Sequence, residues 1–212
     1  MTVTPLERQI AEALLSIGAV SLRPQQPFTW TSGIKSPIYC DNRLTMSHPR
    51  IRDQIAEGFA ALIRERYPQA ELIAGTATAG IPHAAWVAQK LDLPMIYVRD
   101  KAKGHGKQNL IEGQLLPGQQ VVVIEDLIST GGSSLKAAAA VNEAGGRALA
   151  VLAIFSYQFE KAEAAFAAQG VALHTLSNYS ALIDAALAAG SIRQEDVEAL
   201  QAWRKQPETY YQ

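Results

Sequence analysis

Residues 121–134, VVVIEDLISTGGSS, are the part of this chain best suited to chemistry. Four β-branched apolar residues lead into two adjacent carboxylates, Glu125 and Asp126, and hydroxyl residues and glycines follow. Ligands of open α/β sheets bind at the carboxyl ends of the strands, so both carboxylates should line a binding crevice. Each ionised carboxylate can accept hydrogen bonds from two neighbouring hydroxyls, which suits a sugar diol.

The loop after the acidic pair has the composition of a phosphate site. Its backbone N–H groups and the positive end of the following helix attract anions. Glycines allow the backbone a close approach. Hydroxyl donors are available from Ser129, Thr130, Ser133 and Ser134. Either feature alone is often only a helix cap or a turn, but the combination predicts a ligand with a phosphate and a diol, such as a phosphorylated ribose.

A second candidate region, residues 99–118, has the sequence RDKAKGHGKQNLIEGQLLPG. It is rich in lysine and glycine and shows little apolar periodicity, which predicts a long exposed loop. Such loops in compact domains are usually functional or disordered. We interpret this one as functional, because its positive charge precedes the strand that carries the acidic pair. Lys107 is interpreted as an ordinary solubilising charge.

Strands and helices alternate along most of the chain and would position both regions. The apolar patterns predict helices over residues 6–19, 48–67, 79–91, 132–145, 160–170, 181–190 and 193–205, and strands over 71–75, 94–99, 119–126, 147–155 and 171–176. This alternation predicts an α/β, Rossmann-like, mostly parallel sheet with helices on both faces. Residues 28–43 predict two short strands joined by a turn, outside the main sheet.

Composition narrows the class of protein. The chain has 212 residues, which suits one domain, and a net charge of −1, which gives no electrostatic reason to expect nucleic acid or an anionic membrane. Its apolar runs are too short to span a bilayer, and the N-terminus lacks an apolar signal core. Cys40 is the one cysteine, so no internal disulfide can form. We expect a cytoplasmic enzyme or binding protein.

Four segments together resemble one family. Residues 121–134 closely resemble the phosphoribosyl-pyrophosphate signature of type I phosphoribosyltransferases. FTWTSGIKSPIYCDNR (residues 28–43) resembles the Phe-x-x-x-Ser-Gly-x-x-Ser-Pro segment of the orotate phosphoribosyltransferase family. RDKAKGHG (99–106) resembles the mobile catalytic loop of that family, and GTATAGIPHAA (75–85) its pyrophosphate-side loop. The chain departs from some members at Thr31, Ala79 and Asp100, where they have lysine.

The resemblance implies a fold, a reaction and partners. One domain, residues 1–212, would hold a core of about 46–180 and a small hood built mainly from 1–45, with room for a C-terminal contribution. The enzyme would transfer the 5-phosphoribosyl group from phosphoribosyl pyrophosphate to orotate N1, giving orotidine 5′-monophosphate and pyrophosphate in pyrimidine biosynthesis. Mg²⁺ would be held mainly by substrate and water near the acidic pair, without direct protein ligands. The family forms homodimers in which a loop, here 99–118, serves the neighbouring subunit.

The resemblance also implies roles for individual residues. The catalytic residues would be Asp126, Lys103 and His105. Orotate would contact Ser129, Lys35 and Tyr39. Phosphoribosyl pyrophosphate would be bound by Arg99, Lys101, Lys103, His105, Glu125, Asp126, Leu127, Ile128, Ser129, Thr130, Gly131, Gly132 and Ser133.

Other interpretations compete with this one. A phosphoribosyltransferase for a purine or uracil would not need the segment from Ser32 to Pro37. A regulator that binds nucleic acid should show a basic face or an added domain, and a generic nucleotide-binding domain would not need the acidic pair. Among single residues, Cys40 suits buried packing, and His83 and His174 suit the scaffold. Trp30 and Tyr39 suit a base pocket and a core equally.

Overall fold

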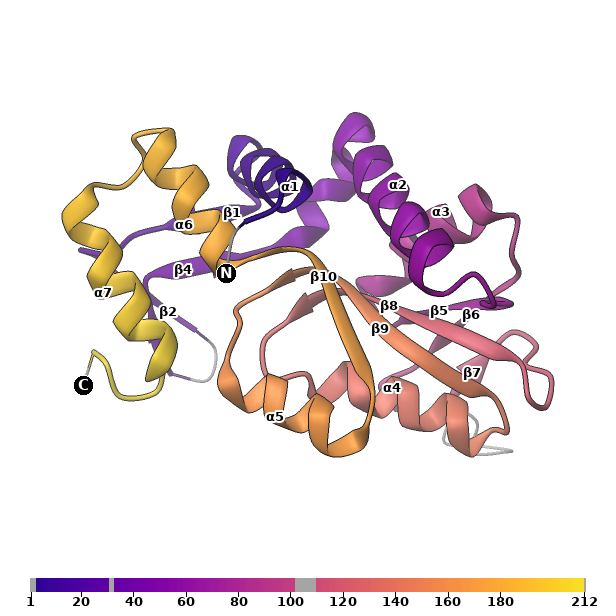
Figure 1. The fold of residues 1–212 in the computed structure, drawn as a ribbon. Coiled ribbons are helices and arrows are strands. Elements are labelled where there is room, and N and C mark those ends of the chain that lie inside the picture. The colour runs from indigo at the N-terminus through magenta and orange to yellow at the C-terminus, as the bar shows by residue number, and fades with distance from the viewer. Residues whose placement is uncertain (1–2, 31–32, 102–109, 212) are drawn as a thin grey trace.

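The computed structural model describes residues 3–30, 33–101 and 110–211. Its centre is a six-stranded sheet in the order β10-β9-β8-β5-β6-β7 (Figure 1). The strands are β5 (Leu72–Thr76), β6 (Met95–Val98), β7 (Ile111–Glu112), β8 (Gln120–Ile128), β9 (Arg147–Ser156) and β10 (Ala172–Asn178). Every pair is parallel except β6 with β7, so the predicted mostly parallel sheet is confirmed.

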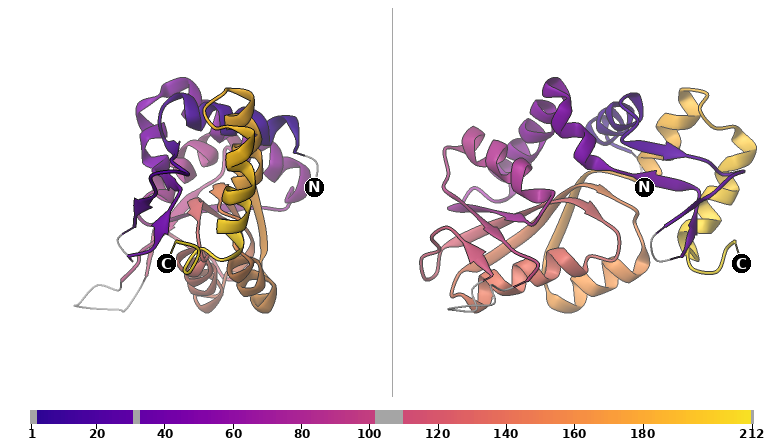
Figure 2. Two further views of the ribbon diagram at one scale, coloured as in Figure 1. Left: turned by 90° about the vertical axis from the view of Figure 1, so that its left-hand side faces the viewer. Right: turned by 180° about the vertical axis from the view of Figure 1, so that it is seen from behind.

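Helices cover both faces of this sheet, as predicted. Helices α1 (Pro5–Ser16), α2 (Pro49–Arg66) and α3 (Gly80–Leu91) lie on one face, and α4 (Gly132–Glu143) and α5 (Glu160–Gln169) on the other (Figure 2). Alternate residues of β8 enter two separate cores: Val122 and Ile124 pack with the first group, Val121 and Val123 with the second. Burial on both faces explains why residues 121–124 of β8 are apolar without alternation.

The remaining elements lie to one side of the sheet (Figure 1). There β1 (Val20–Leu22) pairs antiparallel with β4 (Ile38–Cys40), and β2 (Phe28–Thr29) with β3 (Lys35–Ser36). The 3-10 helix η1 (Asn42–Ser47) follows, and the chain closes with α6 (Tyr179–Ala188) and α7 (Gln194–Lys205). Trp203 of α7 is fully buried, and its Nε1 donates to the Lys35 carbonyl at 3.1 Å. The C-terminal helix therefore packs against the N-terminal strands.

Three details differ from the sequence-based expectations. Residues 28–43 contribute three strands rather than two, because β4 pairs with β1, a strand that the sequence pattern did not predict. The segment 99–118 is not wholly an exposed loop, since Ile111 is 6% exposed and β7 extends the sheet. The acidic pair does not end its strand, because β8 continues to Ile128 alongside β9.

No helix within the described ranges is long and apolar enough to cross a membrane. The cytoplasmic location and the boundaries of hood and core stay predictions.

Candidate active site

The end of β8 is open on one side. Its pairing with β5 stops at Ile124, whereas its pairing with β9 continues to Ile128. Asp126 and Leu127 are half-buried here, and Thr130 is exposed. The Asp126 carboxylate therefore lies near the carboxyl end of β8, beyond its pairing with β5. Ligands of such sheets bind at the carboxyl ends of the strands.

Helix α4 begins at Gly132 directly after this edge. The preceding residue, Gly131, has φ +80°, and a Cβ there would lie 2.6 Å from the Phe166 ring. Both observations require glycine. Because Gly131 has no side chain to cap the helix, the first-turn N–H groups depend on partners from elsewhere. An uncapped helix start near Asp126 has the N–H groups that an anion such as phosphate needs, and the phosphate site itself stays a prediction.

Glu125 is turned towards α4. It is 5% exposed, and its Oε2 accepts hydrogen bonds from Ser133 Oγ at 3.1 Å and Ser134 Oγ at 3.0 Å. Its Oε1 accepts from the Asp126 backbone N–H at 3.0 Å. Burial, followed by the charge of Asp126, raises the pKa of Glu125 to about 8. The Glu125 carboxyl therefore holds the start of α4 through Ser133 and Ser134.

This pKa predicts how stability depends on pH. The folded protein binds a proton at Glu125 that the unfolded chain releases above about pH 4.5, so stability should fall as pH rises from about 4.5 to 8. Glu125→Gln cannot titrate. As pH rises through this window, the unfolding free energy of the wild type should therefore fall relative to that of Glu125→Gln by roughly 1 kcal/mol per pH unit. Urea unfolding of both proteins across the window measures it, and parallel pH profiles would show that Glu125 is already ionised when folded.

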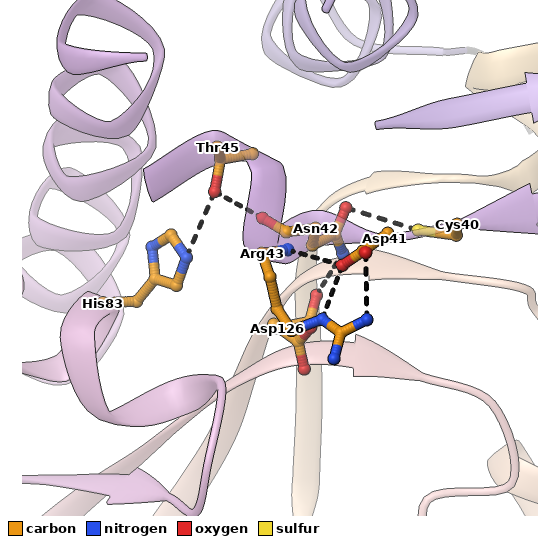
Figure 3. A network of polar contacts seen from close by, with 7 residues as sticks. All are labelled: Cys40, Asp41, Asn42, Arg43, Thr45, His83 and Asp126. Carbon is orange, nitrogen blue, oxygen red and sulfur yellow. Dashed lines mark hydrogen bonds and ion pairs between the residues drawn. The ribbon is translucent and has the colours of Figure 1, made fainter. Parts of the chain in front are cut away.

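Asp126 is held through its backbone. Its carbonyl accepts a hydrogen bond from Asn42 Nδ2 at 2.7 Å (Figure 3). Burial raises the pKa of the Asp126 carboxyl, and the Arg43 guanidinium acts in the opposite direction. Arg43 itself forms a two-point ion pair with Asp41, with Nε–Oδ1 at 2.6 Å and Nη2–Oδ2 at 2.9 Å. Asp126 is the partly exposed carboxylate of the acidic pair.

A small cavity lies between the β5–α3 turn, the end of β6 and α4. It is lined by Thr76, Ala77, Val98, Arg99, Asp100, Ser133, Lys136 and Ala137. Thr76 Oγ1 is buried with no hydrogen-bond partner within the described ranges. Lys136 Nζ contacts the Asp100 carbonyl and lies 3.6 Å from its carboxylate. The cavity brings the predicted residues Arg99 and Ser133 together with a buried hydroxyl and an ammonium group.

The turn after β5 packs tightly on β8. A Cβ at Gly80 would lie 2.4 Å from the Ile124 carbonyl oxygen, so only glycine fits this position. Arg99 Nη1 pairs with Glu112 Oε1 at 3.2 Å, and the Arg99 N–H donates to the Leu110 carbonyl. Lys101 is exposed. Thr31, Lys103, His105 and Lys107 lie outside the described residues.

The predicted base-binding residues lie on the N-terminal strands. Tyr39 is 47% exposed, with its ring 5.7 Å from that of Phe28. Lys35 is exposed. Trp30 packs against Tyr157 and Trp203 and donates to the Ile38 carbonyl, so its role is in the core. Burial raises the pKa of the Cys40 thiol, which disfavours nucleophilic chemistry.

Several residues near the site were not predicted from the sequence. They are Asn42, Thr45, Thr76 and Lys136. Asn42 and Thr76 lie in the segments 28–43 and 75–85 that resemble the family but were not singled out there, and Thr45 and Lys136 stand in no pattern that signals chemistry. His83, predicted as scaffold, is buried, and burial lowers its pKa to about 4. His174 lies 2.7 Å from the Tyr67 hydroxyl, as a scaffold residue would. Within the described ranges no three His, Cys, Asp or Glu side chains form a group that could hold a metal ion. The acidic pair supplies oxygen donors of the kind that Mg²⁺ prefers.

The sequence and the fold of this chain are similar to those of known phosphoribosyltransferases. Residues 46–176 match the model of the phosphoribosyl transferase domain family. An orotate phosphoribosyltransferase of Enterococcus faecalis is 60% identical over 98% of this chain and 99% of that protein, and one of Bacillus caldolyticus is 57% identical over 97% and 99%. A crystal structure of orotate phosphoribosyltransferase from Aeropyrum pernix has a TM-score of 0.75 and 27% identity, covering 87% of this chain and 99% of that one. The UMP synthase of Leishmania donovani has a TM-score of 0.79 and 26% identity, covering 93% of this chain and 42% of that one.

Proposed function

The chain belongs to the orotate phosphoribosyltransferases, and we propose that the end of β8, the start of α4 and the turn after β5 form its site for phosphoribosyl pyrophosphate. The protein is thus a glycosyltransferase of pyrimidine biosynthesis, which joins the 5-phosphoribosyl group to orotate N1 and releases pyrophosphate. One observation carries the proposed location of the site. A partly exposed carboxylate, Asp126, lies near the end of β8, and the loop after it leads into α4, whose start at Gly132 has no side-chain cap.

Each part of the proposed site suits one part of phosphoribosyl pyrophosphate. The 5′-phosphate would occupy the loop 127–133, where backbone N–H groups and the hydroxyls of Ser129, Thr130 and Ser133 can donate. Asp126 would accept from the ribose diol. Glu125 would hold this loop, since a diol bound by Glu125 would compete with the Ser133 and Ser134 hydroxyls. The pyrophosphate would lie near Thr76, Arg99 and Lys136, where a donor and two cations line a cavity.

Orotate is proposed to bind between the phosphate loop and the N-terminal strands. Ser129 would reach it from the loop, and Lys35 and Tyr39 from the other side. Tyr39 offers an exposed ring on which a planar base can stack, and the Lys35 ammonium can pair with the orotate carboxylate. These contacts rest on the resemblance to the family and on the exposure of both side chains.

The chemistry requires charge stabilisation more than proton transfer. Positive charge grows on the ribose ring while negative charge grows on the leaving pyrophosphate. Asp126 would orient the diol and oppose the ring charge, and Arg99, Lys103 and His105 would stabilise the departing group. Mg²⁺, held mainly by substrate oxygens and water, would neutralise pyrophosphate charge, and the oxygens of Asp126 are of the type that Mg²⁺ prefers.

We also propose a homodimer in which the segment 99–118 of one subunit serves the site of the other. This proposal rests on the resemblance of residues 99–106 to the family's catalytic loop. A two-fold dimer would contain two such sites, each completed by the partner.

The metal requirement is tested by following orotate absorbance. Absorbance should fall only when phosphoribosyl pyrophosphate and Mg²⁺ are both present, because the leaving pyrophosphate otherwise keeps its full charge. Chelation with EDTA should stop turnover, and added Mg²⁺ should restore it. Turnover that continues at full rate in excess EDTA would contradict the proposed role of the metal.

A further inference from the structure

Asn42 connects η1 to the end of β8 (Figure 3). Its side chain is 1% exposed, and its Nδ2 donates to the backbone carbonyl of Asp126 at 2.7 Å. The two residues are 84 positions apart in the chain. Beyond Ile124, β8 no longer pairs with β5. There the Asn42 amide supplies the Asp126 carbonyl with a hydrogen-bond donor from outside the sheet.

Neighbouring groups determine the orientation of this amide. The Asp126 carbonyl can only accept, so the amide nitrogen must face it. Asn42 Oδ1 then faces Cys40, whose Sγ donates at 3.3 Å. The side chain of Asn42 is thereby held at both ends, by β4 on one side and by β8 on the other.

The backbone of Asn42 is held as well. Its carbonyl accepts from Thr45 Oγ1 at 2.5 Å. This bond uses the one Thr45 hydroxyl proton, so Thr45 accepts from His83 Nε2 at 3.3 Å, which makes Nε2 the protonated ring nitrogen. Thr45 and His83 are both buried, and they attach η1 to α3. Asn42 thus stands on a well-supported element.

We propose that Asn42 is a positioning residue for Asp126. By holding the Asp126 carbonyl, it sets the orientation in which the carboxylate meets the ribose diol. The proposal rests on the role assigned to Asp126 above. A misplacement of about 1 Å at a reacting group can lower turnover by about 10²-fold, so loss of one anchor should be visible in kcat.

Two variants separate hydrogen bonding from packing. Asn42→Ala removes the donor and leaves a space, whereas Asn42→Asp keeps the shape but turns an oxygen towards the Asp126 carbonyl. We expect each to lower kcat by about 10-fold or more, with a smaller change in KM for phosphoribosyl pyrophosphate, and Asp to be at least as harmful as Ala. A packing role would make Asp the milder change and would overturn the proposal.

Thr45→Val is the matched control for stability. It removes the hydroxyl that holds the Asn42 backbone, while the side-chain hydrogen bonds of Asn42 to Cys40 and to the Asp126 carbonyl remain. It should lower Tm, since a buried acceptor loses its donor, while kcat stays within about 3-fold of wild type. A kcat loss equal to that of Asn42→Ala would attribute the effect to η1 stability and overturn the proposal.

A double-mutant cycle with Asp126→Asn gives the decisive readout. If Asn42 acts through the Asp126 carboxylate, Asn42→Ala should cost less than about 2-fold in kcat once that carboxylate is gone. If Asn42→Ala lowers kcat by the same factor with and without the Asp126 carboxylate, the role of Asn42 alone is overturned. Full turnover of Asp126→Asn by itself would overturn the role of Asp126 as well, so the two failures are distinguishable.

Discussion

Asp126→Asn should lower kcat by about 10²-fold, the effect expected when one preorganised electrostatic group is removed from an active site. The substitution keeps the shape of the side chain and the backbone bond to Asn42, while it removes the charge and replaces one acceptor oxygen with an amide donor. Ground-state binding of phosphoribosyl pyrophosphate should change less, because the carboxylate interacts most strongly as the ring charge grows. Steady-state kinetics with orotate absorbance as the readout measures both quantities.

The matched control for this charge change is Asp184→Asn. Asp184 is an exposed residue of α6, so its substitution should leave kcat and Tm close to wild type. Asp126→Asn should also remain folded, as checked by circular dichroism. Near-normal turnover of Asp126→Asn would assign this carboxylate to the structure of the loop instead of the reaction.

Lys103→Ala should have a comparable effect, a loss of about 10²-fold in kcat. Its ammonium group would stabilise the leaving pyrophosphate, where negative charge is largest in the transition state. KM for phosphoribosyl pyrophosphate should therefore rise much less than kcat falls. Lys107→Ala, in the same segment, is the matched control and should retain most of the activity. If both substitutions lowered kcat equally, Lys103 would act only through the overall positive charge of the segment and not through a specific contact with pyrophosphate.

Mixing two inactive variants tests whether the segment 99–118 serves the partner subunit. Lys103→Ala lacks the loop charge and Asp126→Asn lacks the carboxylate, so a mixed dimer would contain one site with both groups intact. Random exchange makes about half of the dimers mixed, and recovery should approach about a quarter of wild-type activity. No recovery, after subunit exchange has been shown by mass spectrometry, would mean that each segment serves its own subunit.

Much of the fold was predictable from the sequence for a physical reason. Strands buried on both faces are mostly apolar, and β5, β9 and the first half of β8 accordingly stand out as apolar runs between amphipathic helices. The loop that we propose for the phosphate stands out in the sequence because its backbone needs glycine at positions such as Gly131, where the structure has φ +80°. The conformation of this loop is therefore expressed in consecutive residues.

The rest of the site depends on contacts between distant segments. Strands β1 and β7 have three and two residues, too few to show a pattern, and exist because β4 and β6 lie beside them. Lys136 is one of several exposed residues of α4 until folding places it beside Asp100. Asn42 acquires its partner only when η1 meets β8, 84 residues later. No local pattern in the sequence contains this information.

The reaction itself is the most direct test of the account. The protein, with phosphoribosyl pyrophosphate and Mg²⁺, should be offered orotate, uracil, adenine and guanine in parallel, with pyrophosphate release measured for each. We expect rapid release with orotate, together with orotidine 5′-monophosphate in equal amount, and little release with the other bases. A faster reaction with any of those three bases would contradict it.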